Sequence, residues 1–180
     1  VARWIPQMLY YFIGYKNLNI ENSNLVVSVP SGNFGNLCAG MLAKKMGLPV
    51  SHFIASTNEN DTVPKFMKTG KYKKQKTVST ITNAMDVGDP SNFIRILNIY
   101  DNNFESLKKE LTAYKFSDKE TVSGIQELYN NSRYLSDPHG ATAYLGLKKY
   151  LANNPKEIGI FLETAHPVKF LDTVENSIKE

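Results

Sequence analysis

A strand, a glycine-rich turn, a helix and a second strand follow one another within 31 residues and constrain the fold more than any other feature. Residues 25–29 form a short run rich in β-branched apolar side chains, and the run ends in a turn at Pro30, Ser31 and Gly32. A helix is expected over residues 35–46, because Gly47 and Pro49 form a good stop signal. With a second strand at residues 51–55, this unit predicts two parallel strands joined by a right-handed crossover.

The rest of the chain continues the alternation of strands and helices. Helical periodicity predicts one helix over residues 104–114, and an Asp-Pro pair predicts the starts of two others at Asp89 and Asp137. Further helices are expected at residues 4–15 and 118–129, a third strand at 158–162 and a last helix ending near 179. Residues 77–82 are β-prone without a clear assignment. The fold class is therefore α/β, with a mainly parallel sheet and flanking helices.

The first helix is expected to be buried on a broad apolar face. Trp4, Met8 and Phe12 recur at helical spacing. Ile5, Leu9 and Ile13 lie beside them in the sequence and are expected to share that burial.

Composition excludes several classes of protein. The chain has 180 residues, of which 42% are hydrophobic and 21% charged, as in one globular domain or most of one. Its longest apolar runs, residues 8–13 and 25–30, are far shorter than the roughly 20 residues that span a membrane, so no membrane partner is expected. The first residue is Val1, not methionine, and we expect the chain to be a piece of a longer protein.

The positive charge is concentrated in one segment. The net charge is +4, and six lysines with no acidic residue lie between Lys65 and Lys76. A solvated loop is the simpler interpretation, and attraction of an anionic ligand is the alternative. Nucleic acid is not expected as a partner, because no recognised motif accompanies the lysines.

Cysteine and histidine usage gives little sign of a metal or a disulfide. Cys38 is the only cysteine, so a reducing compartment, the cytoplasm, is expected. No cysteine or histidine pair has metal-ligand spacing, so no metal site is expected.

The glycine-rich turn is a candidate phosphate site. Gly32, Asn33, Phe34, Gly35 and Asn36 lie between a strand and a helix, where free N–H groups and the helix dipole favour an anion. The two glycines allow close approach, and the two asparagines can donate from their amides. A purely structural connection between the strand and the helix is the alternative.

A second candidate segment, residues 163–170, follows the third expected strand. Ligands bind beyond the carboxyl ends of strands in open α/β sheets, and both candidate segments leave their strands there. Thr164 could cap the last helix or contact a ligand. His166 is better explained as a turn residue than as a base, and His139 as a packing or capping residue.

Four motifs in register resemble threonine synthases of the bacterial and fungal type. They are LVVSVPSGNFGN at residues 25–36, TNENDTVP at 57–64, NAMDVGDPSN at 83–92 and ETAHPVKF at 163–170. The resemblance extends over the whole chain. It implies the tryptophan-synthase β-like fold (fold type II), pyridoxal 5′-phosphate as the cofactor, and conversion of O-phospho-L-homoserine and water to L-threonine and phosphate.

The resemblance also implies roles for individual residues. Gly32 to Asn36 would hold the cofactor phosphate, Thr164 would meet the pyridine nitrogen, and Arg3 would bind the substrate phosphate. The segment 83–92 would approach the active site. The Schiff-base lysine of the family lies upstream, so no catalytic residue is assigned here. Residues 1–180 would then be part of the large cofactor-binding domain, with the N-terminal portion missing and without turnover when isolated.

Three alternatives remain open from the sequence. One is another fold type II lyase, such as an amino-acid dehydratase, or a sulfhydrylase. A second is a non-catalytic module that binds a phospholigand or a nucleic acid through the lysine segment. The third is a degenerate relative that kept the fold and lost the chemistry.

Overall fold

Four parallel strands form one sheet in the order β3-β2-β1-β4. The computed structural model describes residues 2–18, 20 and 24–179. The strands are β1 (Leu25–Pro30), β2 (His52–Thr57), β3 (Leu111–Lys115) and β4 (Ile158–Phe161). The expected α/β class and parallel sheet are confirmed, and the strands expected at residues 25–29, 51–55 and 158–162 are present.

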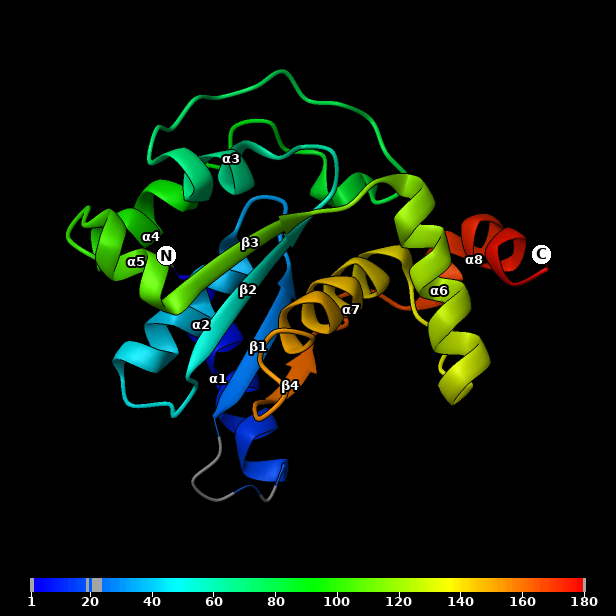
Figure 1. Cartoon of the computed structure of the whole chain (residues 1–180), viewed down its shortest axis with the longest axis horizontal. Coiled ribbons are helices and arrows are strands. Elements are labelled where there is room, and N and C mark those ends of the chain that lie inside the picture. The colour runs from blue at the N-terminus through cyan, green and yellow to red at the C-terminus, as the bar shows by residue number, and fades with distance from the viewer. Residues whose placement is uncertain (1, 19, 21–23, 180) are drawn as a thin grey trace.

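Helices cover both faces of the sheet (Figure 1). The α-helices are α1 (Trp4–Asn17), α2 (Gly35–Lys45), α3 (Thr62–Thr69), α4 (Phe93–Ile99), α5 (Phe104–Glu110), α6 (Asp118–Ser132), α7 (Pro138–Leu151) and α8 (Leu171–Ile178). Two 3₁₀-helices are η1 (Asn83–Met85) and η2 (Pro167–Phe170). Helix α7 lies on one face of the sheet, and α2 with α1 behind it lies on the other. No helix in these described ranges is both long and apolar enough to cross a membrane.

The two central strands are buried along their whole length. Every residue of β1 and β2 is buried, as expected for parallel strands with helices on both faces. Ser28 reaches α7 by donating its hydroxyl to the carbonyl of Ala143 at 2.7 Å. Because its hydroxyl is hydrogen-bonded, Ser28 can occupy a buried position of the strand although it is polar.

Capping residues set the start of the two long helices after β3. Asp137 accepts from the backbone N–H of His139 at 2.8 Å, with Pro138 in the first turn of α7. Ser117 and Glu120 form a capping box at the start of α6. The expected starts of both helices are therefore confirmed.

The single helix expected over residues 104–114 is wrong. Helix α5 ends at Glu110, and Leu111 begins strand β3 opposite Phe53 of β2. Leu107 and Leu111 are both buried. Their four-residue spacing therefore fits the core whether residues 104–114 form one helix or a helix followed by a strand. Residues 111–115 form a strand because the edge of β2 offers free backbone N–H and carbonyl groups as hydrogen-bond partners.

The expected helix start at Asp89 is also wrong. Helix α4 begins at Phe93, and Asp89 instead accepts a hydrogen bond from the Tyr72 hydroxyl at 2.8 Å. Tertiary contact with the lysine segment has replaced the cap that the Asp-Pro pair predicted.

Helix α1 is confirmed, but it is buried on one side only. Trp4, Met8 and Tyr11 are buried in the core. The side chains expected beside them face outward, with exposed fractions of 59% for Ile5, 57% for Leu9 and 55% for Ile13. The expectation that these three are buried is wrong for this chain taken alone.

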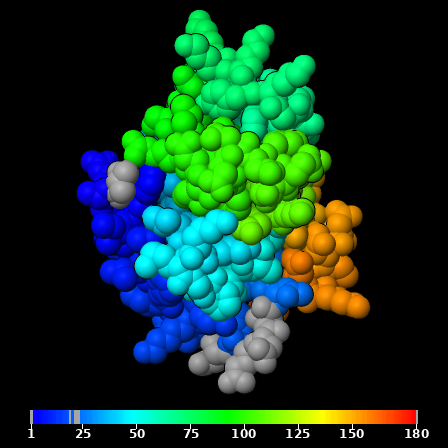
Figure 2. Space-filling model, turned by 90° about the vertical axis from the view of Figure 1, so that its left-hand side faces the viewer, coloured from blue at the N-terminus to red at the C-terminus, as the bar shows by residue number. Residues whose placement is uncertain are grey.

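The lysine segment is not one loop. Lys65 and Lys68 lie on α3, and residues 70–82 form an extended strap that arches over the top of the sheet (Figure 1). The segment around residues 65–80 forms the projecting top of the molecule (Figure 2). Lys65 pairs with Asp61 at 2.9 Å.

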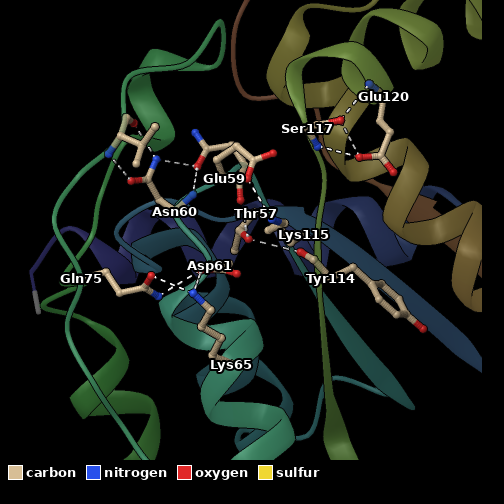
Figure 3. A network of polar contacts seen from close by, with 12 residues as sticks. Thr57, Glu59, Asn60, Asp61, Lys65, Gln75, Tyr114, Lys115, Ser117 and Glu120 are labelled. Atoms are coloured by element: carbon tan, nitrogen blue, oxygen red, sulfur yellow. Dashed lines mark hydrogen bonds and ion pairs between the residues drawn. The ribbon is translucent and has the colours of Figure 1, made fainter.

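Polar side chains at the carboxyl ends of β2 and β3 hold the strap in place (Figure 3). Asn60 accepts from the Val78 N–H at 2.8 Å and donates to the Val78 carbonyl at 2.9 Å. Gln75 donates to Asp61 at 3.0 Å, and Lys115 of β3 pairs with Glu59 at 2.8 Å. The side-chain amide of Asn60 thus makes the hydrogen bonds to the N–H and carbonyl of Val78 that a neighbouring strand would otherwise make. The β-prone residues 77–82 accordingly form no strand.

We expect the protein to lose stability as the pH falls from 6.5 to about 4, because of His52. Its ring stacks on Tyr150, and burial lowers the pKa of His52 from 6.5 to about 4. As the pH falls, His52 therefore takes up its proton in the unfolded chain at a higher pH than in the folded chain. This lowers the free energy of unfolding by about 3 kcal/mol between pH 6.5 and pH 4. Urea denaturation at a series of pH values measures the slope.

The variant His52→Gln removes the titrating ring and should lose that part of the slope. His166→Gln, which changes an exposed histidine, should keep it. Equal slopes in wild type and His52→Gln would contradict the assignment.

Candidate functional site

A cavity of about 580 Å³ opens at the carboxyl ends of β1 and β4. The turn after β1 and the segment after β4 form two of its walls, as expected for ligand sites in parallel sheets. Helix α1, η1 and the start of α7 complete it. The lining residues are Gln7, Tyr10, Tyr11, Gly14, Pro30, Gly32, Asn33, Phe34, Gly35, Asn36, Ala84, Met85, His139, Ile160, Leu162, Glu163 and Thr164.

The structure brings together all six residues predicted to bind the cofactor. Gly32 to Asn36 line one wall and Thr164 lines another. The two segments are 128 residues apart in the chain but follow neighbouring strands, so the parallel pairing of β1 and β4 is what joins them.

The turn after β1 presents free backbone N–H groups. Phe34 adopts a left-handed conformation (φ 62°) and is held there by its buried ring, which packs edge-on against Phe93 with centroids 5.5 Å apart. The first bond of α2 runs from the Cys38 N–H to the Phe34 carbonyl at 2.9 Å. The N–H groups of residues 35–37 therefore have no acceptor within the helix, which suits an anion.

Gly32 allows another segment to close on the turn. A Cβ at this position would lie 2.6 Å from the Cα of Met85 and 3.0 Å from the carbonyl oxygen of Ala84. Ala84 and Met85 also line the cavity, so the segment 83–92 does approach it. Only glycine fits this contact.

Two neighbours fix the direction of the asparagine amides. Ser91 donates its N–H to Asn33 Oδ1 at 2.7 Å, and the Tyr11 hydroxyl donates to Asn36 Oδ1 at 2.8 Å. Burial raises the pKa of Tyr11 well above its usual range, so its hydroxyl keeps the proton that it donates. Within residues 2–18, 20 and 24–179, neither asparagine Nδ2 has a hydrogen-bond acceptor. Both nitrogens are thus available as donors.

Thr164 does not cap the last helical segment, so that alternative is wrong. His166 Nδ1 accepts from the Val168 N–H at 3.2 Å and performs the capping. This contact agrees with the interpretation of His166 as a turn residue. Thr164 is exposed and lines the cavity, three residues after the end of β4.

Next to Thr164 in the chain, the partly buried Glu163 forms a cluster with the buried Ser136, Asp137 and His139. Asp137 Oδ1 lies 2.6 Å from His139 Nδ1, and Ser136 donates to Glu163 Oε1 at 2.5 Å. Burial, reinforced by the neighbouring Asp137, raises the pKa of Glu163 to about 8. Burial alone would raise the pKa of Asp137 too, but hydrogen bonds from His139 and Glu163 hold it below its usual range.

Arg3 is not brought to the cavity. It is exposed just before α1, and that helix reaches the cavity through Gln7, Tyr10, Tyr11 and Gly14 instead. These contributions of α1 were missed, because helical periodicity marks the apolar face and gives no sign of which polar residues meet a ligand. His139 and Glu163 were noticed, but only pairing in space shows that they form a cluster.

The part of the chain with described coordinates holds no group of three or more histidine, cysteine, aspartate or glutamate side chains placed to bind a metal ion. The cavity is instead lined by hydrogen-bond donors, which include the amides of Asn33 and Asn36 and the hydroxyl of Thr164. That set of donors suits an anionic ligand.

A family profile described as "Pyridoxal-phosphate dependent enzyme" matches residues 9–161. The chain belongs to this family. Its sequence is similar to the threonine synthase of Buchnera aphidicola subsp. Baizongia pistaciae, with 48% identity over 180 residues that cover 99% of this chain and 41% of that protein. Threonine synthase of Escherichia coli is 45% identical over 181 residues, covering 100% of this chain and 41% of that protein. The chain thus spans less than half the length of these curated relatives.

Solved structures of the family agree with the fold. The crystal structure of threonine synthase from Escherichia coli superposes with a TM-score of 0.92 at 46% identity, covering 99% of this chain and 41% of that one. The structure of threonine synthase from Brucella melitensis with bound pyridoxal phosphate gives 0.88 at 28% identity, covering 98% and 43%. Maize serine racemase, at 15% identity and a TM-score of 0.62 over 94% of this chain and 52% of that one, shares the fold. The expected fold type II is confirmed.

The residues present fit the family's cofactor. A phosphate needs several N–H donors in a space that no side chain fills, and the turn of Gly32 to Asn36 has both. A pyridine nitrogen needs a hydrogen-bond partner, and the Thr164 hydroxyl lines the same cavity. The volume of about 580 Å³ lies in the usual range for cofactor sites.

Gly32→Ala should weaken both the fold and phosphate binding. The added methyl group overlaps the Met85 backbone, so we expect the free energy of unfolding to fall by about 1–3 kcal/mol. Displacement of the turn should lower the affinity for pyridoxal phosphate at least about tenfold. Urea denaturation and equilibrium dialysis measure the two effects.

Gly14→Ala is the control for stability, because a Cβ there has no neighbour within 4 Å. It should leave the free energy of unfolding unchanged or raise it by up to about 1 kcal/mol. A Gly32→Ala protein as stable as wild type would show that the turn does not pack as described.

Proposed function

We propose that this chain supplies the cofactor-binding part of a threonine synthase. The reaction is conversion of O-phospho-L-homoserine and water to L-threonine and phosphate. One observation carries the proposal: the donor-rich turn after β1 and Thr164 after β4 share one cavity. Similarity to threonine synthases over 99% of the chain selects this reaction among those of the family.

In the proposed site each wall has a separate task. The N–H groups of residues 35–37 and the amides of Asn33 and Asn36 bind the cofactor phosphate. Thr164 donates its hydroxyl to the ring nitrogen, a neutral contact that does not force that nitrogen to carry a proton. When bound, pyridoxal phosphate supplies the electron sink for the reaction. Helix α1 and η1 cover the site and limit the access of water.

Arg3 is proposed to bind the phosphate of the substrate. It precedes α1, whose Gln7 lines the cavity one helical turn further on. A guanidinium group pairs with phosphate through two hydrogen bonds at once.

The covalent attachment of the cofactor is proposed to come from a lysine outside these residues. None of the residues that line the cavity in the described ranges is a lysine. Residues 1–180 are accordingly proposed to be a part of the large domain. This is why no catalytic residue is assigned within them.

The compartment and the partners are proposed from the same residues. Cys38 is buried and is the only cysteine, which is compatible with the reducing cytoplasm. We propose no nucleic-acid partner for the lysine segment, because it is divided between α3 and the strap and shows no recognition motif.

An assay of phosphate release tests the proposed function. With pyridoxal phosphate, the natural protein that carries this chain should form phosphate and L-threonine from O-phospho-L-homoserine in equal amounts. The 180-residue chain alone should form neither, because its cavity has no lysine.

Two results would count against this account. A natural protein that uses threonine or serine and leaves O-phospho-L-homoserine untouched would favour the dehydratase alternative. Substantial phosphate release by the isolated chain would overturn the placement of the lysine outside it.

Arg3→Gln should raise the KM for O-phospho-L-homoserine in the natural protein. Loss of a charge-assisted contact with phosphate predicts an increase of about 10- to 100-fold. The affinity for pyridoxal phosphate, measured by equilibrium dialysis, should not change. Arg133→Gln is the matched control, because it alters an arginine at the end of α6, a helix that contributes no residue to the cavity lining, whereas Arg3 precedes α1, which does. An unchanged KM in Arg3→Gln would remove Arg3 from the substrate site.

A further inference from the structure

One carboxylate connects the strap, the end of β2 and a wall of the cavity. Asp86 directly follows η1, whose Ala84 and Met85 line the cavity. Its Oδ1 atom accepts from the Thr80 hydroxyl at 2.7 Å and from Asn58 Nδ2 at 2.8 Å, and its Oδ2 atom accepts from the Thr80 N–H at 3.0 Å. Asp86 therefore joins η1 both to the strap and to the end of β2.

The partners of Asp86 are themselves fixed in a buried network. Asn58 directly follows β2 and is buried, and its Oδ1 atom accepts from the backbone N–H of Asn60 at 3.0 Å. Asn60 Nδ2 reaches the same oxygen of Asp86 at 3.3 Å. The buried Thr82 accepts from Asn58 Nδ2 at 2.9 Å. Asp86 is thus anchored to a central strand of the sheet, and hydrogen bonds to a carboxylate are among the strong ones.

The backbone of η1 contacts the turn of residues 32–36 with no space left between them. A Cβ at Gly32 would lie 2.6 Å from the Met85 Cα, so the two backbones touch. Further along the same segment, Ser91 donates its N–H to Asn33 Oδ1 at 2.7 Å, which leaves the amide nitrogen of Asn33 for a ligand. A displacement of η1 would therefore move the turn or open a gap beside it.

Attachment of the strap does not explain Asp86, because the strap has other anchors. Gln75 donates its N–H to the Gly88 carbonyl at 3.0 Å, and the Thr62 hydroxyl donates to the same carbonyl at 2.7 Å. Asn60 binds the N–H and the carbonyl of Val78. These contacts hold the strap on α3 and β2 without Asp86. What the carboxylate adds is the position of η1.

We propose that Asp86 is a positioning residue for the phosphate of the ligand. It fixes η1 against Gly32, and η1 keeps the turn of residues 32–36 in the conformation that binds a phosphate. The inference rests on the proposed function, because it takes this phosphate to be that of pyridoxal phosphate. In the ranges with coordinates Asp86 is not one of the residues that line the cavity, so it acts through η1 and not on the ligand itself.

Asp86→Asn in the natural protein tests the inference. The amide keeps the size of the side chain but has one acceptor oxygen in place of two, so η1 loses part of its anchor. We expect the Kd for pyridoxal phosphate to rise about tenfold or more. The Kd for pyridoxal, which lacks the phosphate, should change by less than about twofold. Equilibrium dialysis measures both constants.

Asp61→Asn is the matched control. Asp61 also lies near the carboxyl end of β2 and also accepts from the strap, through Gln75 Nε2 at 3.0 Å. Among the residues with described coordinates, its carboxylate pairs with Gln75 and Lys65 and not with η1. The control should bind both ligands with the wild-type Kd. Equal losses in the two variants, or equal losses of pyridoxal and pyridoxal phosphate in Asp86→Asn, would overturn the inference.

The results separate this inference from the proposed function. No saturable binding of pyridoxal phosphate to wild type would overturn both. Saturable binding with a wild-type Kd in Asp86→Asn would overturn only the role of Asp86.

Should Asp86→Asn fail to fold, hydrogen exchange in wild type provides the answer. The Thr80 N–H donates to Asp86, so its exchange should slow at least about threefold when pyridoxal phosphate binds, but not when pyridoxal binds. The Ser106 N–H, which donates to Asn103 Oδ1 at the start of α5, should exchange at an unchanged rate with either ligand. A Thr80 N–H that exchanges equally fast at saturating pyridoxal phosphate would contradict the coupling.

Discussion

The parallel pairing of β1 with β4 is the constraint on which the site depends. The register that places Leu25 opposite Ile158 brings two segments, far apart in the sequence, to the same edge of the sheet. Each contributes a different kind of donor: backbone N–H groups from the turn at Gly32 to Asn36, and a hydroxyl from Thr164. Neither segment forms a site alone, so the long crossover between the two strands is what makes ligand binding possible.

Neighbouring side chains then orient this site before any ligand binds. Tyr11 and Ser91 occupy the oxygens of Asn36 and Asn33, which leaves the amide nitrogens to donate. Preorganised donors of this kind bind charge without further rearrangement.

Local patterns predicted most of the fold and the cofactor-binding wall, because caps, turns and β-branched runs act over a few residues. The patterns failed where distant contacts decide. Strand β3 forms because β2 offers backbone partners, although Leu107 and Leu111 have helical spacing. The strap forms no strand because the Asn60 side chain satisfies it. The cluster around Glu163 was beyond prediction for the same reason, since its members meet only after folding.

A crystal structure of the natural protein with pyridoxal phosphate tests the central claim most directly. The account predicts that the phosphate lies within hydrogen-bond distance of the N–H groups that begin α2, and that the ring nitrogen faces the Thr164 hydroxyl. A phosphate bound elsewhere, or a ring whose nitrogen points away from Thr164, would contradict it.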